Sequence, residues 1–237
     1  RSTRSASGIR GFMRRRRLLE VCDAARPVAT GRGAPRPGLR GGLRAALRLI
    51  GFAAGLVVAT PVQLVALATG WPARGLAPMG FHRYACMLFG VERKLKGAPA
   101  RGGVLLVANH SSWLDILVLG GCSPAAFAAR ADLATWPVLG LLARLQRTVF
   151  VDRARRGRVG ADAAAIATRL AQGDDVALFA EGTTSDGASI LPFRSALLAA
   201  GDCARAIQPV LIVYVARDGA PLDDEGRADV AWNGDKA

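Results

Sequence analysis

The sequence predicts an α/β protein with a mixed, largely parallel sheet flanked by helices, preceded by an N-terminal membrane-contacting helical region. Three observations carry this prediction. From about residue 100 onward, short apolar runs alternate with helix-like stretches. Before them, residues 49–69 form an uncharged run of 21 residues. At the amino end, positions 1–48 hold 13 Arg against only Glu20 and Asp23.

The first 42 residues are rich in Arg, Gly, Ser and Pro. Such a composition buries little apolar surface, so we expect a disordered basic arm over 1–42. The formal net charge of the chain is +14, and this end of the chain holds most of it. A basic arm can bind anionic lipid headgroups, bind nucleic acid, or remain solvated without a specific partner, and composition leaves these alternatives open.

Residues 49–69 have the length of a bilayer-crossing helix, because an α-helix of this size extends about 30 Å. Arg48 precedes the stretch and Arg74 follows it, while Pro61 and Gln63 interrupt it. Three structures fit this pattern: a spanning helix, a kinked helix in the membrane interface, and a buried core helix. We expect membrane-associated helices over 43–92, in contact with membrane lipids.

Five short apolar runs predict buried strands, and they are residues 104–108, 125–129, 149–151, 176–180 and 209–215. Between two of them, the stretch 158–170 places Val159, Ala163 and Ile166 on one face, as an amphipathic helix does. We therefore expect one α/β domain over 93–237. The last residues form no evident final element, so we expect this domain to be incomplete at its carboxyl end.

The cysteines and histidines do not suit a metal or a disulfide framework. Four cysteines are scattered without a C-x-x-C pair, and the chain has two histidines. We read the cysteines as reduced residues of a cytosol-facing protein, and we expect neither a metal nor a cofactor.

Residues that suit acid–base chemistry follow the first predicted strand, in the segment 109–115 (NHSSWLD). Open α/β sheets usually place their sites at the carboxyl ends of strands, where His110 stands. Two helical residues five apart point about 140° away from each other, so His110 and Asp115 can pair only if a helix begins between them. Ser112, three residues before Asp115, predicts such a helix start. The carboxylate can then orient the imidazole as a general base. The plainer interpretation is that Asp115 only caps the helix and His110 is a polar loop residue.

Four motifs in order resemble the glycerolipid acyltransferase family, over about residues 100–215. In the family's first motif, N-H-x-S-x-x-D, the matching residues are Asn109, His110, Ser112 and Asp115. Residues 150–153 (FVDR) are similar to the second motif, and 179–183 (FAEGT) to the third, usually F-P-E-G-T-R-S. Residues 190–193 (ILPF) and the strand at Pro209 resemble the closing motif.

The resemblance implies an O-acyltransferase of phospholipid biosynthesis, which moves a fatty acyl group from acyl-CoA or acyl-carrier protein to the free hydroxyl of a lysolipid. His110 would deprotonate that hydroxyl, oriented by Asp115, without a covalent acyl-enzyme. The implied location is the bacterial inner membrane, with the active site on the cytoplasmic side. The implied substrate-binding residues are Asn109, Ser112, Arg153, Glu181, Gly182, Thr183 and Thr184.

Physical chemistry suggests tasks for three of these residues. The Arg153 guanidinium, at a strand end, can hold a phosphate, although an ion pair with Asp152 is the alternative. Gly182 permits unusual backbone angles and the close approach of a ligand, although a plain glycine turn is also consistent. Thr183 or its backbone N–H can stabilise charge developing on the thioester oxygen.

One departure from the family pattern concerns the acceptor. The third motif commonly continues with an Arg that helps to bind the acceptor's phosphate, and here that position is Thr184. Ala180 replaces the usual Pro, and this variant resembles the bacterial branch that includes lyso-ornithine-lipid acyltransferases. We expect 1-acyl-glycerol-3-phosphate as the acceptor, because Arg144, Arg147 and residues 153–158 can still supply positive charge, and lyso-ornithine lipid as the alternative.

Other function classes fit less well. A nucleic-acid-binding membrane protein would interleave basic and aromatic residues in the folded part, but aromatic residues make up only 6% of the chain, so we expect no specific nucleic-acid partner. A serine hydrolase needs a G-x-S-x-G elbow, which the sequence lacks. The intact spacing of His110 and Asp115 disfavours an inactive scaffold.

Overall fold

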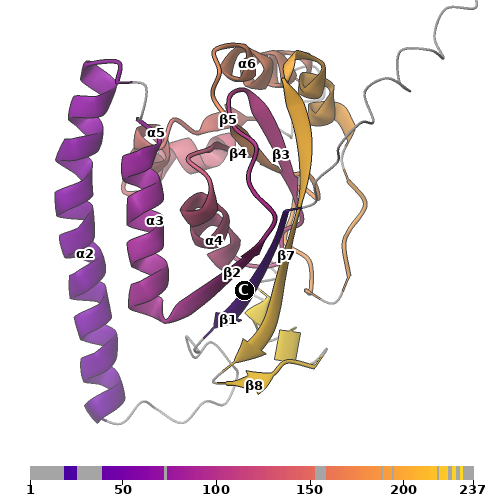
Figure 1. The fold of residues 1–237 in the computed structure, drawn as a ribbon. Coiled ribbons are helices and arrows are strands. Elements are labelled where there is room, and N and C mark those ends of the chain that lie inside the picture. Colours follow the sequence, from indigo (N-terminus) through magenta and orange to yellow (C-terminus); the bar gives the residue numbers. More distant parts are fainter. Residues whose placement is uncertain are drawn as a thin grey trace, which may run out of the picture.

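An eight-stranded, largely parallel β-sheet organises the computed structural model of the chain (Figure 1). The structure describes residues 19–25, 39–71, 74–152, 159–187, 189–193, 195–217, 219–223, 226–227 and 230–231. The strands are β1 (Leu19–Ala25), β2 (Val91–Lys96), β3 (Val104–Ala108), β4 (Ala126–Arg130), β5 (Val149–Val151), β6 (Val176–Phe179), β7 (Ala206–Arg217) and β8 (Ala220–Pro221). The helices are α2 (Leu39–Ala68), α3 (Leu76–Phe89), α4 (Leu114–Cys122), α5 (Leu139–Leu145) and α6 (Val159–Ala171), with the 3-10 helices η1 (Ala131–Thr135) and η3 (Ser195–Cys203).

The strand order β2-β1-β7-β3-β6-β4-β5 places β3 between β7 and β6, with β8 paired to β7. β3 runs parallel to both neighbours, and Ala108 at its end is level with Phe179 of β6 and Val210 of β7. Among the described strands, only β2 and β8 run antiparallel to their partners. β3 and β6 therefore end at the same edge of the sheet, where the segments that follow them meet.

Alternate residues of β3 are buried on opposite faces of the sheet. Val104 and Leu106 pack into the core that α3 and α4 cover, whereas Leu105 and Val107 pack into the core that α6 and η3 cover. Burying one such side chain stabilises the fold by about 1.5–3 kcal/mol. A strand buried on both faces must be apolar throughout, which explains why 104–108 was recognisable as a continuous apolar run.

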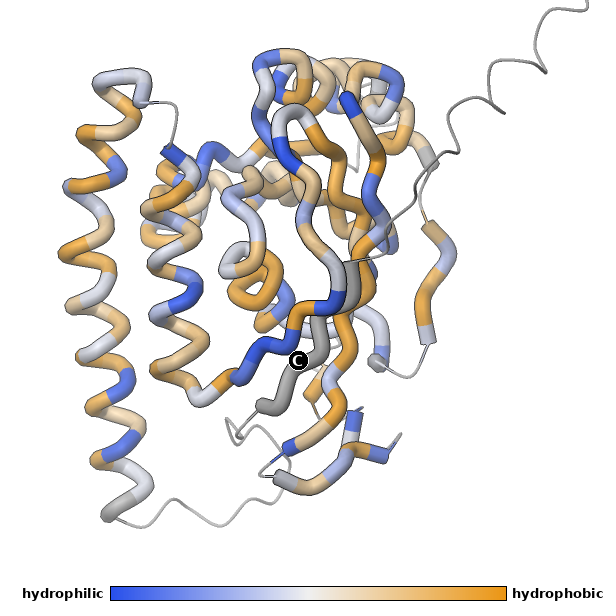
Figure 2. Tube along the Cα trace, in the orientation of Figure 1, coloured by the Kyte–Doolittle hydropathy of each residue, from blue (hydrophilic) through white to orange (hydrophobic). Residues whose placement is uncertain are grey.

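The helix α2 lies outside this layered domain and runs alongside α3 (Figures 1 and 2). It is continuous across Pro61. Its most apolar window, within Gly41–Ala68, has a mean hydropathy of 2.0, yet only 11% of that window is buried. The interpretation of this stretch as a buried core helix is therefore wrong. Of the described helices, α2 alone is long and apolar enough to cross a membrane.

Glycines allow α2 to approach α3 closely. The Tyr84 hydroxyl of α3 donates to the Gly51 carbonyl over 2.8 Å, and a Cβ atom on Gly55 would lie 2.5 Å from the Tyr84 ring. Farther along α2, the buried Gln63 amide donates to the Leu145 carbonyl of α5 over 2.7 Å. Both contacts hold α2 along the surface of the folded domain.

The predicted fold class is confirmed, and the predicted strands correspond to β3, β4, β5, β6 and β7. The observed β7 extends beyond both ends of the predicted 209–215, and the predicted helix 158–170 corresponds to α6. The expected domain boundary between 92 and 93 falls inside β2, whose charged sequence VERKLK gave no strand signal.

The amino-terminal arm departs from its expected disorder at Leu19–Ala25, which forms β1. This strand fills the position between β2 and β7, and it pairs with β7 in parallel and with β2 antiparallel. Its hydrogen-bond partners come from more than sixty positions away in the sequence, so local composition could not predict it. Residues 39–42 belong to α2, and the rest of 1–42 lies outside the described residues.

Candidate active site

The segment 109–115 occupies the sheet edge where β3 and β6 end. Residues after β6 fold back against it: the Ser185 backbone N–H donates to the His110 carbonyl over 2.7 Å, and the Ala180 N–H donates to the Ala108 carbonyl over 3.2 Å. β3 and β6 are parallel neighbours whose last residues are paired with each other. The first and third sequence motifs, which follow these strands, are therefore in direct contact.

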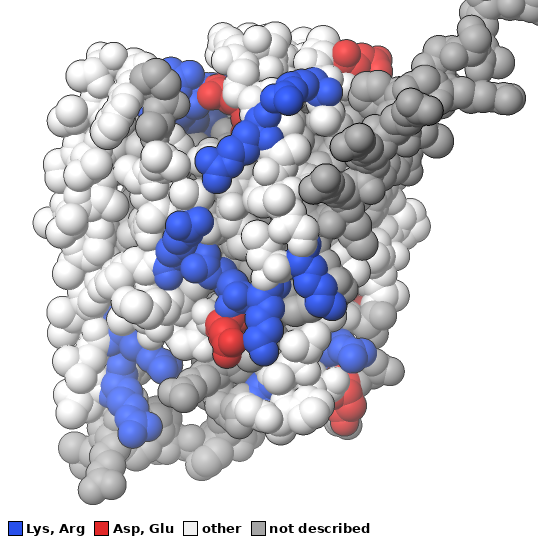
Figure 3. All heavy atoms as spheres, viewed as in Figure 1, with Lys and Arg blue, Asp and Glu red and all other residues white. Residues whose placement is uncertain are grey.

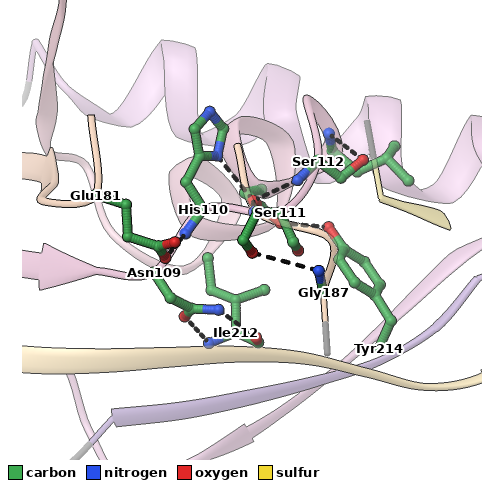
Figure 4. Close-up of polar contacts among 11 residues, drawn as sticks. Asn109, His110, Ser111, Ser112, Glu181, Gly187, Ile212 and Tyr214 are labelled. Carbon is green, nitrogen blue, oxygen red and sulfur yellow. Dashed lines mark hydrogen bonds and ion pairs between the residues drawn. The ribbon is translucent and has the colours of Figure 1, made fainter. Parts of the chain in front are cut away.

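The expected contact between His110 and Asp115 is present (Figure 4). His110 Nδ1 lies 2.9 Å from Asp115 Oδ2, with His110 in the loop and Asp115 in the first turn of α4. The same Oδ2 atom accepts the backbone N–H groups of Ser111 and Ser112 over 2.7 and 2.8 Å. Asp115 therefore accepts two backbone N–H groups from the loop before α4, and it also holds the imidazole.

This hydrogen-bond pattern determines which nitrogen of His110 is able to act as a base. A carboxylate oxygen can only accept, so Nδ1 must carry the hydrogen of the His110–Asp115 bond. Nε2 is then left with a free lone pair, and it points away from the partners drawn in Figure 4. The Asp115 side chain is fully buried, while that of His110 is 18% exposed. The arrangement suits a general base whose ring is oriented by the carboxylate at Nδ1 and whose Nε2 is accessible to a substrate.

The His110 ring also rests on an aromatic side chain of β6. Its centroid lies 4.1 Å from that of Phe179, and the two planes differ by 17°. Phe179 stands at the start of the third motif, so its ring restricts the rotation of the imidazole without competing for its nitrogens.

The Glu181 side chain connects the segment after β6 with the His110 loop and with the segment at Leu191. Its Oε1 accepts the His110 backbone N–H over 2.7 Å, and its Oε2 accepts the Leu191 N–H over 3.0 Å. Burial raises the pKa of Glu181, and these two hydrogen bonds oppose that rise. Both carboxylate oxygens are thus bonded to backbone, which gives Glu181 a positioning role; its expected contact with substrate stays a prediction.

β7 holds the loop through the backbone of Ile212 and the side chain of Tyr214. The Asn109 amide donates to the Ile212 carbonyl over 2.9 Å and accepts the Ile212 N–H over 2.7 Å. Two residues farther along β7, the Tyr214 hydroxyl donates to Asp115 Oδ1 over 2.6 Å. Tyr214 was not predicted from the sequence, because an apolar strand containing one tyrosine gives no signal that this hydroxyl reaches a carboxylate 99 positions away.

The other predicted site residues are placed as follows. Gly182 has a φ of 77°, in the left-handed region where glycine is favoured, as its expected unusual backbone requires. Thr183 is exposed, Thr184 is half-buried, and Ser112 is buried with its hydroxyl 3.4 Å from the Leu114 N–H. Arg153 and residues 154–158 lie outside the described residues.

Arg147 does not supply positive charge to this site. The Arg147 guanidinium makes a bidentate pair with Asp174, which precedes β6 and so lies at the opposite edge of the sheet from Glu181. Arg144 donates to the Ala134 carbonyl over 3.3 Å. Among the described residues, no group of three or more His, Cys, Asp or Glu is placed to hold a metal ion.

Comparison of the sequence with known proteins shows which family it belongs to. A family model described as Acyltransferase matches residues 92–213, which include the whole segment 109–115 and Glu181. A lyso-ornithine lipid O-acyltransferase of Brucella abortus is 44% identical over 178 residues, which are 71% of this chain and 66% of that protein. A second one, of Rhizobium meliloti, is 39% identical over 76% of this chain and 64% of its own length.

Two further proteins are similar. A 1-acyl-sn-glycerol-3-phosphate acyltransferase of Neisseria gonorrhoeae is 32% identical over 66% of this chain and 62% of its own length. The crystal structure of a 1-acyl-sn-glycerophosphate acyltransferase from Thermotoga maritima superposes with a TM-score of 0.48 at 19% identity, over 77% of this chain and 88% of that one. The chain spans about two thirds of the length of the curated relatives named here. Because the family model covers half of the chain and relatives reach 44% identity, the chain belongs to the acyltransferase family.

Proposed function

We propose that this protein transfers a fatty acyl group from an acyl thioester to the free hydroxyl of a lysolipid, with His110 as general base. The observation that carries the proposal is the buried Asp115 carboxylate, which bonds His110 Nδ1 and leaves Nε2 open. In this mechanism Nε2 takes the hydroxyl proton while the acceptor oxygen attacks the thioester carbonyl. The C–S bond then breaks, and the imidazolium returns the proton to the leaving thiolate.

The segment after β6 is the candidate for stabilising the transition state. As the hydroxyl attacks, negative charge develops on the thioester oxygen, and hydrogen-bond donors placed there lower the barrier. Gly182 in its left-handed conformation turns the chain just beyond Glu181, so Thr183 is presented at the exposed side of the site. We assign the backbone N–H or hydroxyl of Thr183 to this task. The donor is acyl-CoA or acyl-carrier protein.

Lyso-ornithine lipid is the acceptor that we favour. Two relatives named for that substrate are 44% and 39% identical to this chain, while the Neisseria gonorrhoeae glycerophosphate enzyme is 32% identical. Thr184 also favours lyso-ornithine lipid over the glycerophosphate acceptor. It stands where family members commonly have an Arg that binds the acceptor's phosphate, and it carries no positive charge. 1-Acyl-glycerol-3-phosphate, which the motifs alone put first, is the second candidate because of that Neisseria relative.

The surface around α2 suits a lipid bilayer. Gly51 and Gln63 both contact the folded domain, so α2 lies along that domain over about 18 Å, which favours a helix in the membrane interface. Figure 3 shows Lys and Arg side chains near the amino-terminal end of α2, where anionic headgroups would lie, and an uncharged surface along the rest of the helix. Large apolar side chains are exposed on α2 and on the adjoining η1–α5 segment: Ile50, Val57, Val58, Val65, Trp136, Val138, Leu139 and Leu141.

This surface supports association with a membrane, and we propose the cytoplasmic side of the bacterial inner membrane. There a lysolipid can enter the site sideways from the bilayer while the thioester donor arrives from the cytosol. Sedimentation with membranes after detergent-free lysis tests the membrane contact, and a wholly soluble protein would contradict it.

The substrate is tested by acyl transfer in membranes from cells that express the protein. Lyso-ornithine lipid and lysophosphatidate are offered in parallel, each with acyl-CoA and with acyl-carrier protein as donor, and the His110→Ala protein serves as control. We expect His110-dependent acylation, fastest with lyso-ornithine lipid. A preference for lysophosphatidate would reverse the order of the two acceptors, and the absence of transfer to either would refute the proposed function.

A further inference from the structure

The two oxygens of the Asp115 carboxylate have different partners. Oδ2 accepts from His110 Nδ1 and from two backbone N–H groups. Oδ1 accepts from the phenol of Tyr214 over 2.6 Å. Asp115 is 0% exposed and Tyr214 is 5% exposed, so water does not compete strongly for this bond. A buried carboxylate oxygen needs such a donor, because an unpaired buried acceptor is costly.

The sheet explains how Tyr214 reaches the carboxylate. β3 ends level with Val210 of β7, and β7 continues to Arg217 alongside the loop that follows β3. Side chains of a strand alternate between faces, so Val210, Ile212 and Tyr214 all point toward the core that α4 covers. Ile212 meets Asn109 and Tyr214 meets Asp115, at the two ends of the same loop.

We propose that Tyr214 is a positioning residue for acyl transfer, which acts through Asp115 by fixing Oδ2 on His110 Nδ1 and by moderating the charge that this carboxylate presents to the imidazole. The inference rests on the proposed function and adds a residue to it. Tyr214 does not touch the reacting atoms. Its hydroxyl bonds Asp115, and Asp115 in turn bonds His110.

The Tyr214 hydroxyl interacts differently with the two protonation states of the His110–Asp115 pair. The Tyr214 hydrogen bond is stronger while His110 is neutral, since the Asp115 charge is then not compensated by an imidazolium. By reciprocity, Tyr214 favours the neutral, basic form of His110, and loss of the hydroxyl favours the protonated form. The Glu181 carboxylate is a charged group beside the His110–Asp115 pair, and any Tyr214 variant retains it.

The test replaces each of the two tyrosines of the chain in the same way. Tyr214→Phe removes the hydroxyl from Asp115, while the matched control Tyr84→Phe removes the hydroxyl that bonds Gly51 between α2 and α3. We expect Tyr214→Phe to lower kcat/KM about tenfold, mainly through kcat, because one buried partner of a charged group is lost. We expect the acid limb of its pH–rate profile to move up by about half a pH unit or more. Tyr84→Phe should leave that limb in place.

A readout without substrate separates this inference from the proposed function. The chain has two histidines, so NMR of ring-labelled protein follows the titration of His110 directly, with a His82→Gln sample for assignment. We expect the His110 resonances to titrate at higher pH in Tyr214→Phe than in the wild type. Incorporation of 3-fluorotyrosine at 214, a stronger donor of nearly the same size, should move the titration the other way and serves if Tyr214→Phe does not fold. An unmoved titration, or a lower rate with an unmoved acid limb, would overturn the proposal even in an active enzyme.

Discussion

The two histidines of this chain lie in contrasting surroundings, although each sits beside a phenylalanine of the sheet. His110 lies at the sheet edge, with its ring stacked on Phe179 and Nδ1 bonded to Asp115. His82 lies between α3 and α4, with its ring centroid 6.4 Å from that of Phe127. Within the described part of the chain, His82 Nδ1 has no hydrogen-bond partner.

This difference in partners gives the two rings different chemistry. Burial lowers the pKa of His82 to about 4; a hydrogen bond with Gln146 opposes the shift, and the charge of Arg93 adds to it. His82 is therefore a neutral packing residue at physiological pH. His110 has a carboxylate behind it and an open nitrogen in front, which is what proton transfer needs. A histidine becomes a candidate base through its hydrogen-bond partners and its exposure.

The largest effect that this comparison predicts is the loss of the carboxylate behind His110. Asp115→Asn should keep an acceptor for the Ser111 and Ser112 N–H groups but remove the charge that supports the imidazolium. We expect kcat to fall by about 10³-fold or more in the acyl-transfer assay. Asp132→Asn, at an exposed carboxylate paired with Arg130, is the matched control and should keep near wild-type activity. Comparable rates in the two variants would mean that Asp115 only caps the helix.

The His110–Asp115 contact was predictable from the sequence because both residues and the helix start between them lie within seven positions. β3 and β6 were predictable because strands buried on both faces are continuous apolar runs. Tyr214 and the two contacts of Glu181 were not, since they join segments 99, 71 and 10 positions apart and depend on register. β1 and β2 carry charged residues and were missed, because their pairing depends on neighbours elsewhere in the chain.

The second prediction concerns His82 and pH. Its folded-state pKa is about 4, against an ordinary value of 6.5, so between these values the unfolded chain binds the extra proton. The contribution of neutral His82 to the free energy of unfolding is fully present above pH 6.5. It is lost as the pH falls toward 4, and the loss is about 3 kcal/mol. The measurement is denaturant unfolding of wild type and His82→Gln across this range. The difference in the free energy of unfolding between wild type and His82→Gln should become smaller as the pH falls. A difference that stays constant with pH would show that unfolding does not change the protonation of His82.

A third, smaller effect probes the packing that buries His82. A Cβ atom on Gly120 of α4 would lie 2.6 Å from Cδ2 of His82, so Gly120→Ala must displace the ring or α4. We expect a loss of about 1–3 kcal/mol in the free energy of unfolding. Gly80→Ala on α3 is the control, since a Cβ there meets nothing within 4 Å, and it should stabilise by about 0.5–1 kcal/mol. Equal stability of the two variants would argue against tight packing around His82.

The smallest expected effect concerns Thr184, which lies close to the His110 loop. Thr184→Arg restores the cation that the family's third motif commonly carries, at a half-buried position near Ser185, whose N–H bonds the His110 carbonyl. We expect the ratio of lysophosphatidate to lyso-ornithine lipid acylation to rise several-fold, as one additional phosphate contact would produce. Ser189→Arg, five positions later and exposed, is the control. An equal change in both variants would indicate a general charge effect.

The central claim is that one of the two histidines is the base of acyl transfer and the other is not. The most direct measurement makes the same substitution at each, His110→Gln and His82→Gln, and follows lyso-ornithine lipid acylation in membranes at pH 7.5. We predict that His110→Gln loses activity by about 10³-fold while His82→Gln stays within a few-fold of wild type. Substantial turnover by His110→Gln in a folded, membrane-bound protein would contradict the account.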